Sequence, residues 1–315
     1  MKRLLLKILL FFGLFIIPFL ALFLTPYPKD FAYHFIKNDC YNHGAWIYDR
    51  ITKNTVPIDI AFIGSSHTIH AYQEKKMEDR LGPDYHLANL GYCRYGRDLE
   101  YLTLKLLLRN KSPKMIVLEV HEDEEKNSHD IFPFLAETKD IIFTPTLINR
   151  DYLADLIHGA SARLEYFKTT YVFTEKIPIT DFSLYGYGES MRTVSEKELT
   201  DNEMAWGKRL GRKTFESVEE VQLKYPMAYL KKMVELIKEK NRSIVFVYLP
   251  EFGSKLKVPK YAGYYQSIAP LLIPPESVLD NPVYWMDASH LNDKGSEILS
   301  EWMVKQIQNE FCLNH

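Results

Sequence analysis

Cysteine is scarce in this sequence of 315 residues, and no two cysteines form a close pair. Cys40, Cys93 and Cys312 are far apart, and the chain has no CxxC motif. This spacing argues against a zinc ribbon or a disulfide framework. It leaves room for one disulfide bridge and a spare thiol.

The sequence also lacks an excess of charge of either sign. Its formal net charge is -2, and it has no basic patch, long charge run, internal repeat or low-complexity segment. These absences argue against nucleic acid as a partner. The length allows one large domain or two smaller ones, with enough sequence for a buried core.

Charged residues are missing altogether from one stretch near the N-terminus. Three positive residues precede an uncharged run over residues 8–28, which is about the 20 residues that a membrane-spanning helix needs. The positive-inside rule then predicts a cytoplasmic N-terminus and an extracytoplasmic body, periplasmic or on the outer face. A cleaved signal peptide is the competing interpretation, but its apolar core is usually only about 7–15 residues long. We predict an uncleaved single-pass anchor over residues 1–28 and a juxtamembrane segment with a short helix over residues 29–56.

Apolar runs and amphipathic segments alternate along the rest of the chain. Runs typical of buried strands occupy residues 58–63, 85–90, 115–120 and 243–249, and amphipathic patterns predict helices over residues 72–81, 98–109 and 227–240 and at the C-terminus. Such alternation is typical of right-handed βαβ units and a parallel sheet. We therefore predict an α/β domain over residues 57–315.

The regular pattern is lost between about residues 127 and 224, where aromatic residues are scattered among turn residues. So long a departure inside a domain is typical of an inserted subdomain or of a lid over an active site. A purely structural elaboration fits the same pattern. Residues 261–277 also look irregular.

The first apolar run leads directly into Gly64-Ser65-Ser66. Ligands of parallel α/β sheets gather beyond the carboxyl ends of the strands. Glycine permits a sharp turn there, which would expose the Ser66 hydroxyl beside the first amides of the next helix. Those amides suit an oxyanion. In the other interpretation, Ser65 or Ser66 simply caps the helix.

Asp287 and His290 form a second candidate pair, three residues apart before the last helix. The carboxylate can hold the Nδ1–H of the imidazole, which leaves Nε2 free to take a proton from a serine. Serine needs such a base to become a good nucleophile. We expect Ser66, Asp287 and His290 at strand ends. The alternative is that Asp287 caps the last helix and His290 is an ordinary polar residue.

These motifs resemble the SGNH, or GDSL-like, superfamily of serine esterases and acyltransferases. The match comprises Ile63-Gly-Ser-Ser66, Asn89-Leu-Gly91 and Asp287-Ala-Ser-His-Leu-Asn-Asp-Lys-Gly295. The resemblance implies a three-layer α/β/α sandwich with a flavodoxin-like sheet and no cofactor. It also implies that Ser66 is the nucleophile, His290 the base and Asp287 its orienting partner, with the amides of Ser66 and Gly91 as oxyanion donors.

Two positions depart from the pattern of the superfamily. Ser65 stands where an acidic residue is common, and the third block reads Val120-His-Glu-Asp123, without its usual asparagine. The third oxyanion donor is therefore open, with His121 and Arg94 as candidates, while a carboxylate such as Glu122 would repel an oxyanion. Losing one donor typically lowers the rate by about 10²–10³-fold.

The anchor and the Gly-Ser-Ser variant resemble the envelope branch of the superfamily, which includes the D-alanyl transfer protein of teichoic acid synthesis and the O-acetyltransferases of exopolysaccharides. This resemblance implies an acyl-Ser66 intermediate whose acyl group passes to a hydroxyl of a carbohydrate or envelope polymer. It also implies a membrane-bound acyl carrier or O-acyltransferase as a partner. With water as the acceptor, the same site would be an esterase.

Two other interpretations remain. A metal-dependent hydrolase is one, because imidazole and carboxylate ligands suit zinc or manganese, although no known metal-binding spacing is present. The residues that could gather at the strand ends are His67, His70, His121, Glu122, Asp123, Asp287 and His290. A non-catalytic envelope protein that uses the fold for binding or assembly is the other, favoured by the altered third block.

Overall fold

A parallel β-sheet forms the centre of the computed structural model, which describes residues 2–35, 41–144, 148–174, 176, 183–211 and 216–312. The strands lie in the order β2-β1-β3-β4-β5, which is the order of flavodoxin-like sheets. The α/β class and the parallel sheet are thus confirmed. The strands are β1 (Ile60–Ile63), β2 (Leu87–Asn89), β3 (Met115–Val120), β4 (Ser243–Tyr248) and β5 (Leu271–Leu272).

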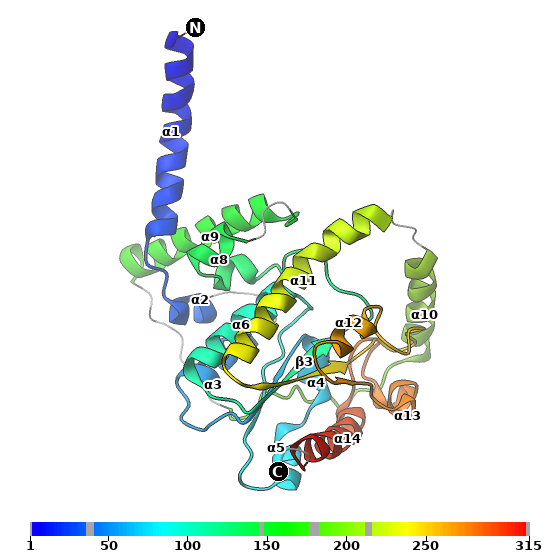
Figure 1. Cartoon of the computed structure of the whole chain (residues 1–315). Helices are drawn as coiled ribbons and strands as arrows, with labels where there is room; N and C mark the ends of the chain where they lie inside the picture. Colours follow the sequence, from blue (N-terminus) through cyan, green and yellow to red (C-terminus); the bar gives the residue numbers. More distant parts are fainter. Residues whose placement is uncertain are drawn as a thin grey trace.

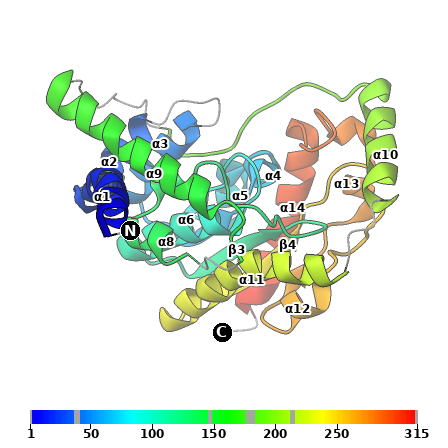
Figure 2. The same ribbon diagram turned by 90° about the horizontal axis from the view of Figure 1, so that it is seen from above.

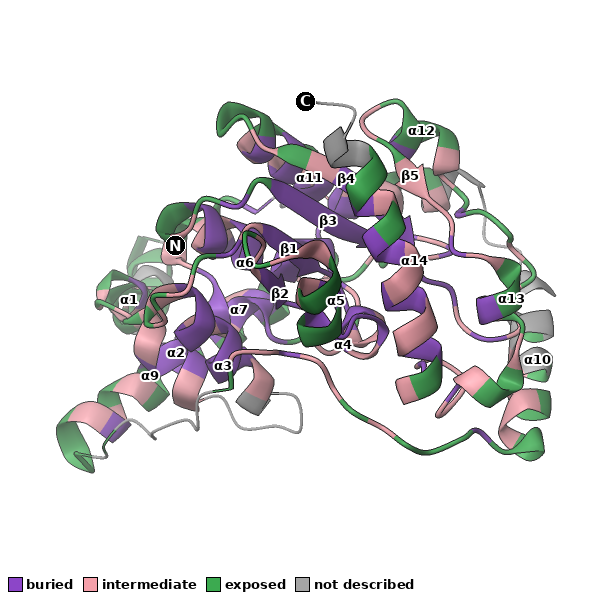
Figure 3. Cartoon of the chain, turned by 90° about the horizontal axis from the view of Figure 1, so that it is seen from below, coloured by how far each residue is buried: buried purple, intermediate pink, exposed green. Residues whose placement is uncertain are grey.

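Helices pack on both faces of the sheet, because its side chains alternate between two apolar clusters. Ile60 and Phe62 of β1 join one cluster with α5 (Glu74–Leu81) and α14 (Asp293–Cys312). Ala61 and Ile63 join the other with α6 (Arg97–Asn110) and α11 (Glu216–Glu239). Figure 3 shows β1, β2 and β3 in the purple of buried residues, between helices that carry green on their outer sides.

Several element boundaries differ from the prediction. The helix expected over residues 72–81 is preceded by a separate helix, α4 (Ser66–Ala71), because Tyr72 is extended and its ring stacks on Phe62 at 4.4 Å. The helix expected from residue 227 begins earlier, at Glu216. Strand β5 lies in a segment where no pattern was seen, since two residues are too few to show a period.

The N-terminal helix α1 (Lys2–Leu24) projects from the domain (Figure 1) and is long and apolar enough to cross a membrane. Its last turn is part of the domain. The Phe23 ring is buried beneath the Arg163 guanidinium at 4.8 Å, and the Thr138 hydroxyl donates to the Phe23 carbonyl at 2.9 Å. Two helices follow, α2 (Lys29–Phe35) and α3 (Tyr41–Thr52), where one short helix was expected.

The region without a sequence pattern is largely helical. It contains α7 (Phe132–Leu135), α8 (Thr138–Ile142), α9 (Tyr152–Phe167), the π-helix η1 (Lys168–Val172) and α10 (Glu196–Gly211). The first two are four and five residues long, too short for an amphipathic repeat to appear. Figures 1 and 2 show α9 beside α1 and α10 on the other side of the domain.

Residues 183–194, here called the strap, lie across the ends of α4, α5 and α14. The backbone amides of Gly186 and Tyr187 donate to the buried Glu74 carboxylate at 2.7 and 3.0 Å. Farther along, the Ser190 amide donates to Asp293 at 2.8 Å. The strap therefore joins the start of α5 to the start of the last helix.

Candidate active site

The Gly-Ser-Ser turn separates β1 from α4 and gives its two serines different tasks. Ser65 is the N-cap of α4, and its Oγ accepts the His67 amide at 3.0 Å. Ser66 is the first residue of the helix and is half-buried. The capping interpretation therefore applies to Ser65, while the hydroxyl of Ser66 has a different partner.

That partner is His290. The Ser66 Oγ lies 2.8 Å from His290 Nε2, and His290 Nδ1 lies 2.9 and 3.0 Å from the two carboxylate oxygens of Asp287. All three side chains are only partly buried. The structure thus brings together the three residues on which the sequence hypothesis depends, although 224 positions separate Ser66 from His290.

A tight loop holds the Asp287 carboxylate toward the imidazole. An antiparallel bridge between Trp285 and Leu291 closes the loop, and Asp287 Oδ1 accepts the amides of Ser289 and His290 at 2.8 Å each. Burial acts to raise the pKa of Asp287, but the hydrogen bond and charge of His290 and the two amides lower it to about 2. The carboxylate is therefore ionised at neutral pH and can orient the Nδ1–H.

The loop also departs from two sequence expectations. Asp287 and His290 lie in the loop, not at the end of a strand. Asp287 also does not cap the last helix, because Asn292 takes that role: its Oδ1 accepts the amides of Lys294 and Gly295 at 3.1 and 3.2 Å. The carboxylate is thereby left to the histidine.

Gly91, the other expected oxyanion donor, lies against the serine turn. A Cβ at this position would lie 2.7 Å from the Ser65 carbonyl oxygen and 2.8 Å from the Ile69 nitrogen, so the close approach requires glycine. Among the described residues, the Gly91 amide makes one long hydrogen bond, 3.3 Å, to Asn89 Oδ1. The Ser66 amide is at the first helical position, where α4 itself supplies no acceptor.

Glu119 supports the turn from below and was missed by the sequence analysis. It lies in β3 and is fully buried, and its carboxylate accepts the Ser65 amide at 2.8 Å, the Ser65 hydroxyl at 2.6 Å and the Thr68 amide at 3.0 Å. The Thr68 hydroxyl and His121 Nε2 complete the set. A single acidic residue within an otherwise apolar strand was the signal that could have revealed it.

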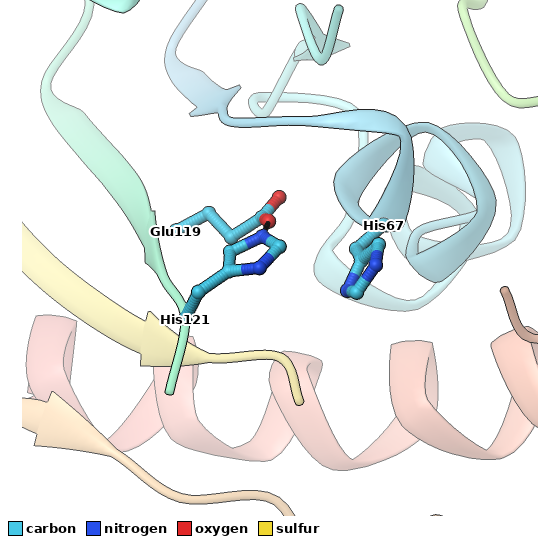
Figure 4. Close-up of side chains that lie close together, drawn as sticks. All are labelled: His67, Glu119 and His121. Atoms are coloured by element: carbon cyan, nitrogen blue, oxygen red, sulfur yellow. Dashed lines mark hydrogen bonds and ion pairs between the residues drawn. The ribbon is translucent and has the colours of Figure 1, made fainter. Parts of the chain in front are cut away.

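Glu119 and His121 form an ion pair beside the neutral His67 (Figure 4). Burial opposes charge on both partners, but the attraction between them holds the pKa of Glu119 well below its usual range and raises that of His121. Burial, assisted by the charge of His121, lowers the pKa of His67 to about 3. The buried carboxylate of Glu119 and the imidazole of His121 therefore favour each other's charged form beneath the Ser65-Ser66 turn.

The same three residues are the best metal-ligand candidates near the turn. One ligand atom from each of His67, Glu119 and His121 lies within 4.8 Å of the others, and two imidazoles with a carboxylate can bind zinc. Both Glu119 oxygens already accept hydrogen bonds, however, so a cation would compete with five donors. His70, expected in the same group, is held by the strap, with Nδ1 at 2.6 Å from the Gly188 carbonyl.

The remaining candidates lie around a cleft of about 1110 Å³ beside His121. Arg94 is exposed there and pairs with Asp130, and Glu122 is buried and accepts the Glu251 amide at 2.9 Å. Neither side chain has a contact with Ser66 among those of the described residues. His121, which is 3.2 Å from Ser65 Oγ, is the candidate third donor closest to the turn.

This arrangement can perform general-base-assisted attack by a serine hydroxyl on a carbonyl carbon. Because Asp287 holds Nδ1, the Nε2 of His290 faces Ser66 as a proton acceptor. The chain matches no protein-family model, no curated protein and no solved structure. The geometry of these residues is therefore the basis for assigning a function.

Proposed function

We propose that the protein is a membrane-anchored serine acyltransferase or esterase that acts through an acyl-Ser66 intermediate. The observation that carries the proposal is the continuous hydrogen-bond series from Ser66 Oγ through His290 to Asp287. A serine, a histidine and a carboxylate in this order activate the serine on several unrelated folds. No cofactor is required for this chemistry.

In the first half-reaction, Ser66 Oγ attacks the carbonyl carbon of an acyl ester or thioester, and its proton passes to His290 Nε2. The leaving group takes that proton as its bond to the acyl carbon breaks. In the second half-reaction, an acceptor hydroxyl gives its proton to His290 and attacks the acyl carbon, and as the bond to Ser66 Oγ breaks, His290 returns the proton to that oxygen. The Ser66 and Gly91 amides are the proposed oxyanion donors.

We place the reaction outside the cytoplasmic membrane, with α1 as a single-pass anchor and carbohydrate or another envelope polymer as the acceptor. Two observations support this location. Positive residues precede the apolar run of α1, and Cys93 is disulfide-bonded, which is typical of oxidising compartments. A membrane-bound acyl carrier or O-acyltransferase is the proposed source of the acyl group.

The proposal extends to the architecture around the site. Helices on both faces of the sheet favour a three-layer sandwich of the SGNH type. Within the insertion, we assign the strap as a cover for the substrate. The strap carbonyl of Gly188 holds His70, and the His70 ring lies 5.0 Å from the ring of His290.

Labelling with an active-site serine probe tests the mechanism. We expect a fluorophosphonate to modify the peptide that carries Ser66 in the full-length protein, and the label to be lost in Ser66→Ala and strongly reduced in His290→Ala. Ser267→Ala, which changes an exposed serine directly after α12 (Ala262–Gln266), is the control and should label normally. Adduct on another residue would overturn the assignment.

The same preparation distinguishes the two other functions. Stoichiometric zinc or manganese, with turnover of a simple acetyl ester abolished by chelation, would favour metal-dependent hydrolysis at His67, Glu119 and His121. Absence of both label and turnover in a folded protein would favour a binding or assembly role. Ester turnover that disappears in Ser66→Ala would exclude that role.

A further inference from the structure

The helix α9 and its continuation η1 carry exposed apolar side chains that no other element of the described residues covers. Leu153, Ile157 and Leu164 are 73 %, 62 % and 44 % exposed, and their spacing of four and seven residues places them on one side of the helix. Exposed apolar side chains at the end of α9, in η1 and just after it continue this surface. These are Phe167, Tyr171, Val172 and Phe173.

The opposite side of α9 contacts the rest of the domain. It packs against α1, α7 and α8, and its buried positions are mostly small, including Gly159, Ala160 and Ala162. A Cβ on Gly159 would lie 2.8 Å from Ile141 of α8 and 3.4 Å from Phe23 of α1. The apolar surface thus faces away from the domain and is not part of its core.

The position of α9 relative to α1 indicates what covers this surface. Figure 1 shows α9 running crosswise at the end of α1, and Figure 2, from above, shows α1 end-on with α9 lengthwise and uncovered. Arg163 of α9 lies over the rings of both Phe23 and Tyr27, at 4.8 and 4.9 Å. A helix attached to the last turn of a membrane-spanning segment lies at the depth of the membrane surface.

The chemistry of the surface fits that depth. Aromatic and aliphatic side chains on one side of a helix are typical of segments that lie in the membrane interface, where tyrosines are also enriched. Tyr27 and Tyr166 pack together at the junction with ring centroids 6.0 Å apart. Where α9 meets η1, the Lys168 ammonium pairs with the exposed Glu165 at 2.8 Å.

We propose that α9 and η1 form a second membrane contact, an interfacial helix whose apolar surface enters the outer leaflet of the bilayer that α1 crosses. The lipid acyl chains are its occupant. With α1 crossing the bilayer and α9 lying in the plane of its surface, the tilt of the domain relative to the membrane is fixed. With α1 alone, the domain could change its tilt. The proposal depends on α1 entering a bilayer and is independent of the chemistry at Ser66.

Tryptophan quenching by brominated acyl chains tests the contact in the full-length protein, reconstituted as one copy per nanodisc. None of the four native tryptophans lies in residues 1–24, so their emission is the same background in every variant and can be subtracted. We expect Ile157→Trp and Phe167→Trp to lose most of their added emission in brominated lipid. Val283→Trp, at a position 48 % exposed near α14, should lose little.

Ile17→Trp, at an exposed position of α1, reports insertion of the anchor. Quenching of Ile17→Trp without quenching of Ile157→Trp and Phe167→Trp would overturn the proposal. Protection of these two positions from water-soluble iodide only in nanodiscs that hold two copies would also overturn it, because the surface would then belong to a second copy of the chain.

Discussion

Ser65 and Ser66 are neighbours with the same side chain, yet their surroundings differ completely. Ser65 faces a buried anion and caps α4, whereas Ser66 faces the imidazole of His290. This difference follows from where each Cβ points at the start of the helix. Substitutions that keep shape but change charge can therefore test the two environments separately.

The first prediction concerns the orientation of His290. In Asp287→Asn, the side-chain amide no longer provides the anion that holds Nδ1–H, so the imidazole loses its useful tautomer. Ester turnover should fall by about 10⁴-fold while the fold is retained. The measurement is kcat with an acetyl ester, with circular dichroism as the folding check; a decrease below tenfold would contradict an orienting role for Asp287.

The second prediction concerns Glu119. Gln in its place would direct an amide group at donors and leave His121 without its carboxylate partner, so Glu119→Gln should lower the free energy of unfolding by about 3–5 kcal/mol. Urea unfolding measures the change. The control is Glu297→Gln, because Glu297 makes a surface pair with Lys76 at 2.9 Å, where the expected loss is about 1 kcal/mol or less. Equal losses in the two variants would contradict the supporting role.

At the scale of the elements, the strap is attached to a buried carboxylate, that of Glu74. Its amides at Gly186 and Tyr187, together with that of Asn89 in β2, all donate to the Glu74 carboxylate. Burial outweighs these hydrogen bonds and raises the pKa of Glu74 to about 7. The attachment of the strap is therefore linked to protonation near neutral pH.

The third prediction follows from the sign of this shift. A carboxyl group with a raised pKa favours folding when it is protonated, so its contribution is full below about pH 4.5 and is lost as the pH rises through about 7. The free energy of unfolding of the wild type, relative to that of Glu74→Gln, should thus fall between pH 5 and 8 by an amount on the order of 3 kcal/mol. The difference in Tm between the two proteins, measured across this pH range, follows the change. Asp79→Asn, an exposed change in the same helix, should show the wild-type profile. A constant difference between wild type and Glu74→Gln would contradict the linkage.

At the scale of the whole molecule, the end of α1 and the domain form one structure. The end of α1 contributes a buried phenylalanine to the main apolar cluster, and α9 packs against it. A signal peptide would be removed without loss to the fold, whereas removal of this segment would expose the surface that Phe23 covers.

The fourth prediction is therefore that the mature protein retains α1. Intact-mass spectrometry of protein extracted from membranes should give the mass of a chain that includes Leu24 and the residues before it. Alkaline carbonate, which removes peripheral proteins, should leave the protein in the membrane pellet. A mature chain that begins beyond Leu24 would support the signal-peptide interpretation.

The sequence alone determined the elements whose pattern is long or chemically distinct. The apolar run of α1, the buried strands β1 and β3, and the helix α6 follow from hydrophobic pattern, because burial imposes a composition and a period on the chain. Ser66, Asp287 and His290 could also be singled out, since turn chemistry and the three-residue spacing are local features.

Tertiary structure decided what depends on contacts between distant residues. It paired Ser66 with His290, placed Glu119 under the turn, attached the strap to Glu74 and laid α9 against the end of α1. Local pattern carries no record of these contacts, because a buried carboxylate or a short helix is specified by its partners across the fold. The identity of the candidate residues was thus present in the sequence, and their arrangement arose only when the sheet brought them together.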